Sequence, residues 1–171
     1  ESGCEVRRLA ALFVLLAADV RVAEVVALDA ELLGIESNVR QSGLEPGLLH
    51  LVKTRASQVN RCAYCIDMHT KDARAGGETE QRIYALSAWR ETPFFTERER
   101  AALAWTEAIT LISHGSVPEA LYDEARRSFS EKELVDLTLG LIAINGWNRL
   151  AIAFRSVPGT YQPMKRSETR A

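Results

Sequence analysis

The chain has 171 residues, about the length of one domain. Its 21 basic and 23 acidic side chains give a net charge of −2, which argues against nucleic-acid binding because such surfaces carry a basic excess. A hydrophobic content of 47% predicts a folded core. Three cysteines, Cys4, Cys62 and Cys65, are too few for a disulfide-stapled secreted scaffold. We therefore expect residues 1–171 to form a single domain.

The N-terminal segment holds a basic pair followed by an apolar run. Arg7 and Arg8 precede the apolar residues 9–18, an order similar to the basic and apolar parts of a signal peptide. The run is too short to span a bilayer as a helix, and Asp19 ends it. We interpret residues 1–25 as an atypical N-terminal helix, amphipathic or buried, and expect a cytoplasmic protein that does not bind membranes.

Helical periodicity dominates the rest of the chain, and strand signals are scarce. Pro46 stands where a first helical residue is favoured. The pairs Thr96–Glu99 and Ser130–Glu133 have the spacing of capping boxes. These signals predict an all-α bundle whose short connections favour antiparallel neighbours. The predicted helices span residues 6–18, 22–41, 46–59, 62–75, 79–90, 97–113, 118–128 and 131–155.

The segment 131–155 is apolar on nearly every face, which is typical of a helix buried in a large core or in a subunit interface. In a chain this small, the pattern favours a homo-oligomer. Asn145 and Asn148 interrupt the apolar surface and need hydrogen-bond partners if they are buried. Residues 158–171 form a polar tail, which we expect to lie on the surface or to fray.

One short segment combines cysteine and histidine at helical spacing. Cys62, Cys65 and His69 stand at i, i+3 and i+7, which places them within about 60° on one helical face. Asn60 is a suitable N-cap, so Cys62 is expected in the first turn, where free N–H groups and the helix dipole stabilise a thiolate. Arg61 adds a cation, and His69 follows Cys65 by one turn as a base. This pattern favours a redox dithiol.

Two other interpretations of the cysteine pair stay open. Free cysteines are often simply buried, so the pair can be structural. Cys62, Cys65 and His69, with His50 reaching back as the fourth ligand, would also complete a tetrahedral zinc site. Zinc is less favoured because the cysteines lie within a regular helix and the fourth ligand comes from another element. We therefore expect neither a bound metal nor a cofactor.

Longer runs around these residues resemble a known family. The resemblance rests on residues 48–73, which contain the Cys-x-x-Cys-x-x-x-His core, and continues through residues 95–105, 129–138 and 144–150. These runs are similar to the alkylhydroperoxidase D (AhpD)/carboxymuconolactone decarboxylase family over about residues 28–155. The resemblance implies an AhpD-like all-α fold that assembles into trimers or hexamers. It also implies peroxidase and disulfide reductase activity, with electrons from lipoyl groups or small thiols.

The resemblance assigns a role to each matching residue. Cys65 matches the peroxide-reacting thiol, Cys62 the resolving or partner-facing thiol, and His69 the proton-relay histidine. Twelve residues before the first cysteine, where the family usually has a glutamate, this chain has His50. A neutral imidazole there can still accept a proton. Arg61 stands where a glycine is common. The decarboxylase branch of the family lacks the cysteine pair, so its chemistry is not carried over.

Together these patterns predict a thiol-dependent alkylhydroperoxide reductase with an antioxidant role. Its expected catalytic residues are Cys65, Cys62, His69 and His50. Its expected partners are a hydroperoxide, a thiol or lipoyl-type reductant, and further copies of the chain. The alternatives are a disulfide reductase or redox-sensing module with weak peroxidase activity, a zinc-stabilised structural domain, and a scaffold whose proton relay has decayed with the loss of the glutamate.

Overall fold

The computed structural model describes residues 22–163, and that part of the chain is helical with no strand. The all-α prediction is therefore confirmed. The predicted helix 6–18 and Cys4 lie outside the described residues. The helices are α2 (Val22–Arg40), α3 (Pro46–Val59), α4 (Ala63–Ala75), α5 (Glu80–Ala85), α6 (Glu97–Thr110), α7 (Glu119–Ser128) and α8 (Glu131–Ala153), with 3₁₀ turns η1 (Leu86–Glu91) and η2 (Ile112–His114).

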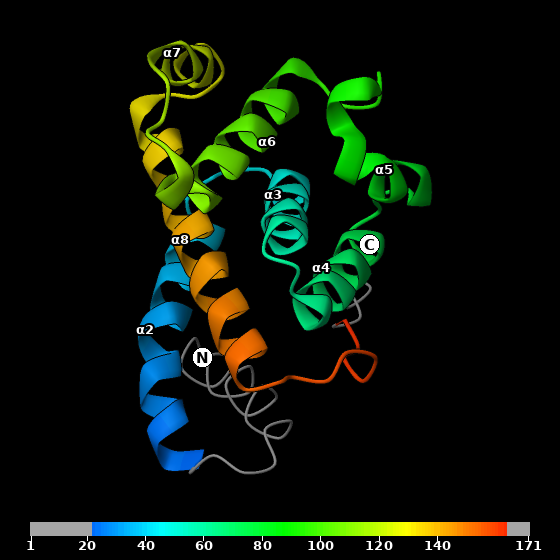
Figure 1. The fold of residues 1–171 in the computed structure, drawn as a ribbon, viewed down its shortest axis with the longest axis vertical. Coiled ribbons are helices and arrows are strands. Elements are labelled where there is room, and N and C mark those ends of the chain that lie inside the picture. The colour runs from blue at the N-terminus through cyan, green and yellow to red at the C-terminus, as the bar shows by residue number, and fades with distance from the viewer. Residues whose placement is uncertain (1–21, 164–171) are drawn as a thin grey trace, which may run out of the picture.

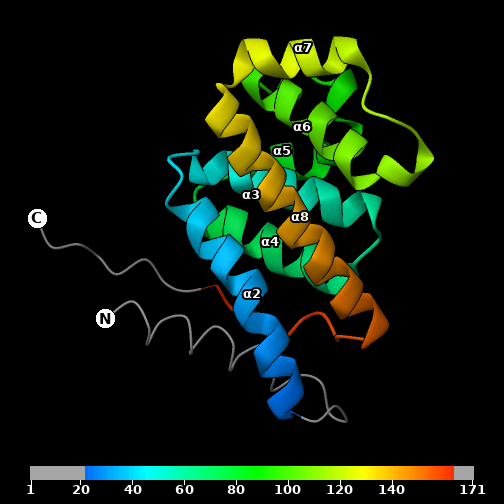
Figure 2. The ribbon, with the colours of Figure 1, turned by 90° about the vertical axis from the view of Figure 1, so that its left-hand side faces the viewer.

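Helix α3 lies at the centre of the bundle, in contact with α4, α6 and α8. Helices α2 and α8 run side by side along one flank, and α7 closes the end above α6 (Figures 1 and 2). The main core joins α3, α6 and α8 through fully buried side chains, among them Val52, Ala102, Leu137, Leu141 and Ile144. Because α3 is surrounded in this way, it is a rigid base for the loop that leads into α4.

The predicted helix starts are confirmed where the sequence carries capping signals. Pro46 occupies the first turn of α3, where its missing N–H costs nothing. Thr96 and Glu99 form a capping box at the start of α6, and Ser130 and Glu133 form one at the start of α8. Each box satisfies N–H groups that a helix leaves without intrahelical partners. These caps fix where α6 and α8 begin.

The predicted single helix 79–90 is wrong in its second half. It breaks into α5 and the turn η1, and Ala88 leaves helical geometry with φ −119° and ψ 32°. Arg100 of α6 donates to the carbonyl oxygen of Trp89 at 3.1 Å, and the Trp89 indole donates to Glu107 at 2.9 Å, so η1 is tied to α6. In a continuing helix the Trp89 carbonyl would have no partner, because residue 93 is a proline and has no N–H.

The predicted helix 97–113 also ends early, at Thr110. Leu111 departs from helical geometry, and the following residues 112–114 make a 3₁₀ turn whose side chains are exposed. The segment has left the core at this point, so no burial supports a longer helix.

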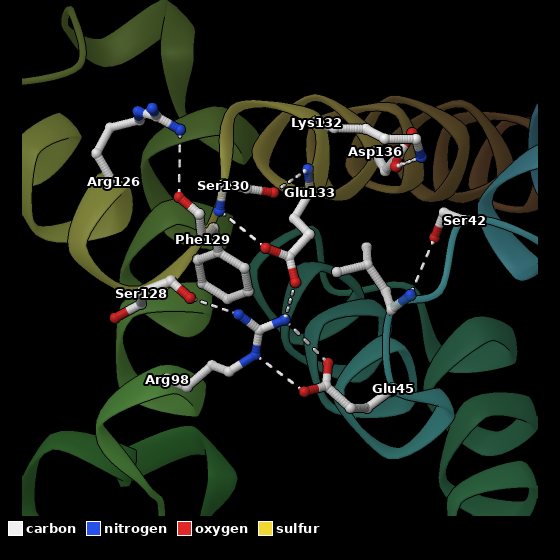
Figure 3. A network of polar contacts seen from close by, with 11 residues as sticks. Ser42, Glu45, Arg98, Arg126, Ser128, Phe129, Ser130, Lys132, Glu133 and Asp136 are labelled. Atoms are coloured by element: carbon white, nitrogen blue, oxygen red, sulfur yellow. Dashed lines mark hydrogen bonds and ion pairs between the residues drawn. The ribbon is translucent and has the colours of Figure 1, made fainter.

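Arg98 joins three helix starts at one end of the bundle (Figure 3). Its guanidinium donates to Glu45 at 2.9 Å, to Glu133 at 2.7 Å and to the carbonyl oxygen of Ser128, and it lies 4.1 Å from the centre of the Phe129 ring. Hydrogen bonds from the N-cap residue of α8 and from Arg98 lower the pKa of Glu133 to about 2. The cluster holds α3, α6 and α8 together at the end remote from the cysteines.

Helix α8 carries apolar side chains on both its inner and its outer face, as its sequence predicts. Leu137 and Leu141 are fully buried, whereas Val135, Ile142 and Ile152 are about half exposed, at 58%, 50% and 49%. Within residues 22–163, no helix has the length and apolar character needed to cross a membrane.

Candidate active site

Cys62 and Cys65 form a disulfide at the start of α4, with their Cα atoms 5.3 Å apart. Cys62 is itself the N-cap, and its sulfur accepts the Cys65 N–H at 3.3 Å. The prediction that Asn60 caps this helix is wrong, because Asn60 keeps αR geometry as the C-cap of α3. The cap position nevertheless brings the Cys62 sulfur to the positive end of α4, where N–H groups and the dipole favour a thiolate once the disulfide is reduced.

The loop between α3 and α4 is a Schellman motif with arginine in the place of glycine. The Cys62 N–H bonds to the carbonyl of Ser57, and the Arg61 N–H to that of Gln58. Arg61 therefore takes a left-handed conformation, with φ 59°. This geometry gives a physical reason for the glycine that the family resemblance places at this position, since glycine adopts it without a Cβ penalty.

We expect Arg61→Gly to raise the free energy of unfolding by up to about 1 kcal/mol, because it relieves the left-handed strain of a residue with a Cβ. Arg61 is exposed, so little packing is lost. Denaturant unfolding of the oxidised protein measures the effect. The control Arg61→Ala removes the same charge and keeps the Cβ; if it proves more stable than Arg61→Gly, the explanation by strain is wrong.

A buried amide network fixes this loop to α8. The Asn60 side-chain amide donates to Asn145 Oδ1 at 2.9 Å and to Asn148 Oδ1 at 2.8 Å. Asn148 in turn donates to Ser57 Oγ at 3.1 Å and has no exposed surface. The expectation that the two asparagines of 131–155 have partners is thus confirmed; some lie just before Cys62, and Asn145 also donates to Thr110 Oγ1 of α6 at 3.2 Å.

The disulfide is enclosed by side chains from α4 and α8. Cys62 and Cys65 are 1% and 0% exposed, and they pack with Tyr64 and Met68 of α4 and Ala151 of α8. Sulfur atoms buried to this degree are shielded from bulky reagents. A large reductant therefore reaches the disulfide only when the start of α4 or the end of α8 moves.

His69 lies one turn beyond Cys65 and is also buried, with 7% exposure. Among the described residues its Nε2 has no hydrogen-bond partner, and its Nδ1 lies 3.9 Å from a carboxylate oxygen of Asp72. Burial, together with the positive charges of Lys53 and nearby groups, holds its pKa well below the ordinary value. The imidazole is therefore neutral at pH 7 and presents an unused nitrogen within the protein, which is the state a general base requires.

His50 does not reach back over the cysteines. Its ring packs near Gly76, at the opposite end of α4 from the disulfide; a Cβ on Gly76 would lie 3.5 Å from His50 Cδ2. Burial lowers the pKa of His50, and the negative charge of Asp72 opposes that shift. His50 thus faces the Asp72 end of the site, where a direct exchange of protons with Cys65 is not available to it.

The placement of His50 removes the fourth ligand from the zinc interpretation. Among the described residues, no group of three or more histidine, cysteine, aspartate and glutamate side chains is arranged to hold a metal ion. Zinc also needs thiolates, whereas the two sulfurs here are bonded to each other. The geometry of the site therefore gives no support to a zinc-stabilised domain.

Two further residues of the site were not predicted from the sequence. Asp72 follows His69 by three residues, a spacing that places both on one helical face and that could have been recognised. Tyr161 lies in the segment expected to lie on the surface or to fray, and its phenol donates to Asp72 at 2.6 Å. No local pattern signals a contact between residues 89 positions apart.

Comparison with known proteins supports the sequence resemblance. A sequence model of the carboxymuconolactone decarboxylase family matches residues 23–108. YdfG of Bacillus subtilis (strain 168), described as uncharacterised, is 48% identical over 122 residues, or 71% of this chain and 83% of that protein. YnjA of Escherichia coli (strain K12), also described as uncharacterised, is 28% identical over 117 residues, 68% of this chain and 62% of that protein.

Solved structures show the same fold. A crystal structure from Agrobacterium tumefaciens, described as a protein of unknown function and a candidate antioxidant defence protein AhpD, has a TM-score of 0.74 at 43% identity over 77% of this chain and 90% of that one. The debrominase Bmp8 has a TM-score of 0.70 at 20% identity over 78% of this chain and 72% of its own, and shows the fold alone. The helical bundle defines an AhpD-like protein. The chain belongs to the carboxymuconolactone decarboxylase family.

Proposed function

We propose that the protein is a thiol-dependent hydroperoxide reductase in which Cys65 attacks the peroxide and Cys62 resolves the product. The observation that carries the proposal is the Cys62–Cys65 disulfide, which starts α4 one turn before a buried, neutral His69 with a free Nε2. The Cys62–Cys65 pair can take up and release two electrons, and His69 places a base beside it inside an enclosed site. Membership of a family with AhpD-like structures is consistent with an antioxidant role.

The reaction begins from the reduced dithiol. His69 Nε2 takes the proton of the Cys65 thiol, and the resulting thiolate attacks one oxygen of the hydroperoxide. A sulfur–oxygen bond forms as the O–O bond breaks, giving Cys65 sulfenic acid and an alkoxide. The alkoxide takes the proton from the His69 imidazolium and leaves as the alcohol.

Resolution then restores the bonded pair seen in the structure. The Cys62 sulfur attacks the Cys65 sulfenic acid, so that a disulfide forms and water leaves. The sum is two thiols and one hydroperoxide giving a disulfide, an alcohol and water. An external dithiol, of the small-thiol or lipoyl class, returns two electrons and two protons to the pair.

A stoichiometric oxidation experiment tests the proposal. Protein reduced and freed of reductant under nitrogen receives one equivalent of cumene hydroperoxide. We expect each equivalent to give cumyl alcohol and a protein that has lost two hydrogen atoms, with the bond mapped to Cys62 and Cys65 by peptide mass spectrometry. Persistence of both thiols beside unreacted peroxide contradicts the proposal.

The same reduced protein distinguishes the proposed peroxidase from the alternative function, a disulfide reductase. A disulfide reductase passes its electrons to a small disulfide such as oxidised lipoamide and leaves the hydroperoxide untouched. If the small disulfide oxidises the protein rapidly and the hydroperoxide gives no alcohol, the protein is a disulfide reductase and the peroxidase proposal is wrong. The trimer or hexamer implied by the family also stays a prediction; the half-exposed Val135, Ile142 and Ile152 of α8 support it.

A further inference from the structure

The segment that follows α8 returns across the bundle and lies along α4 (Figure 1). We call residues 158–163 the strap. Its backbone and side chains bind α4 at three residues, Asp67, Lys71 and Asp72, so it lies on the surface but does not fray. The strap joins the end of the described chain to the helix that carries the disulfide and His69.

The contacts between the strap and α4 are polar. The Gly159 N–H donates to Asp67 Oδ2 at 2.9 Å, and Lys71 donates to the carbonyl oxygen of Tyr161 at 3.1 Å. The Tyr161 phenol donates to Asp72 Oδ1 at 2.6 Å. Burial and this hydrogen bond raise the pKa of Tyr161, so the phenol stays protonated and remains a donor.

Asp72 lies between the strap and the histidine. Its Oδ1 accepts the Tyr161 phenol, while its Oδ2 lies 3.9 Å from His69 Nδ1. In the described part of the chain, Asp72 is the one carboxylate with an oxygen within 4.0 Å of a His69 nitrogen. With Nδ1 on the Asp72 side, Nε2 is the nitrogen left for another partner. Cys65 is one turn away on the same face of α4.

The other charged groups that act on His69 are cationic or basic. Lys53 and His50 of α3 and Arg40 of α2 all lower the pKa of the imidazole. Lys53 is in turn ion-paired to the buried Glu36 of α2. An imidazolium formed at His69 therefore needs a nearby anion, and Asp72 supplies it from within α4.

We propose that Asp72 is the positioning residue for His69 and that Tyr161 of the strap holds Asp72 in place. Asp72 fixes the imidazole with Nδ1 toward the carboxylate and Nε2 free for the Cys65 proton, and it stabilises the imidazolium that results. His50 of α3 supplies an imidazole and no carboxylate; the carboxylate near His69 comes from α4. The inference rests on the proposed function for the identity of the reacting thiol.

The sign of the effect follows from the charges. Neutralising Asp72 removes the anion that favours the His69 imidazolium, so the imidazole becomes a weaker base. A weaker base takes the Cys65 proton less readily. The pH at which Cys65 is half ionised therefore rises when Asp72 becomes asparagine.

The experiment titrates Cys65 in reduced protein without any peroxide. Short pulses of iodoacetamide at a series of pH values, followed by peptide mass spectrometry, give the midpoint of Cys65 alkylation separately from the other cysteines. We expect Asp72→Asn to raise this midpoint by about 1 pH unit. Asp72→Glu should restore part of the shift, and Tyr161→Phe should raise the midpoint by less than Asp72→Asn does, because the carboxylate is still present but loses its support.

Asp67→Asn is the matched control. It neutralises another carboxylate on α4, which accepts from the strap at Gly159, while the Tyr161–Asp72 hydrogen bond remains; among the described residues, Asp72 and not Asp67 has a carboxylate oxygen within 4.0 Å of His69. We expect its alkylation midpoint to equal that of the wild type. An unchanged midpoint in folded Asp72→Asn, or an equal shift in Asp67→Asn, overturns the inference.

The outcome of the titration does not depend on whether the protein is a peroxidase. If the wild type forms no alcohol from hydroperoxide but Asp72→Asn still shifts the Cys65 midpoint, the peroxidase proposal is wrong and the role of Asp72 stands. If the wild type forms alcohol at the expected yield but Asp72→Asn leaves the Cys65 midpoint unchanged, the peroxidase proposal stands and the role of Asp72 is wrong.

Discussion

Replacing Cys65 by serine is expected to lower steady-state hydroperoxide turnover by about a thousandfold or more, because a serine hydroxyl at neutral pH is not a nucleophile toward the O–O bond. The base is still present in this variant, since His69 and Asp72 are unchanged. The loss therefore reports the nucleophile and not the proton relay. The measurement is alcohol formation from cumene hydroperoxide with excess dithiol.

Cys62→Ser is the control that separates attack from resolution. Without external dithiol, it should consume one equivalent of hydroperoxide and keep a sulfenic acid on Cys65 that dimedone captures, whereas the wild type ends as the disulfide. Both cysteines are equally buried, so access alone does not explain a difference between the two variants. If Cys65→Ser turns over at the wild-type rate, or if dimedone labels Cys62 in it, the assigned roles are wrong.

Asn148→Ala is expected to destabilise the fold by about 2–3 kcal/mol, a large effect for a single side chain. Asn148 has no exposed surface, and it links Asn60 to Ser57. Alanine leaves a buried amide and a hydroxyl each short of one partner, and water cannot replace them without entering the core. Equilibrium denaturant unfolding of the oxidised protein measures the change.

Arg149→Ala is the neighbouring control for this prediction. Arg149 is exposed and donates only to Asn145, from the surface. We expect its free energy of unfolding to stay within about 0.5 kcal/mol of the wild type. Equal losses in Asn148→Ala and Arg149→Ala would show that the buried network adds nothing beyond an ordinary helix contact.

The sequence was informative wherever a local rule decides the structure. The capping boxes at Thr96 and Ser130 gave the starts of α6 and α8, and Pro46 gave that of α3. The helical spacing of Cys65 and His69 predicted that they share one face of a helix, and both side chains are buried on α4. These features depend on residues within one or two turns of each other.

Features set by distant residues could not be predicted in this way. The contacts of η1 with Arg100 and Glu107 come from α6, and the strap depends on Asp72 meeting a tyrosine 89 positions later. The misplaced cap at Asn60 has the same origin, because α8 takes the Asn60 amide for its own asparagines. In each case a side chain bonds to a residue far away in the sequence: Asn60 to the asparagines of α8, and Tyr161 to Asp72.

The covering of the disulfide by Ala151 has a consequence for biosynthesis. The two cysteines leave the ribosome well before the end of α8 does, so for that interval the thiols lack the side chain that later shields them. The strap follows α8 and brings Tyr161 to Asp72. Until α8 and the strap dock, a nascent chain thus carries an exposed dithiol whose proposed proton relay is incomplete, and the order of synthesis delays assembly of the protected site until then.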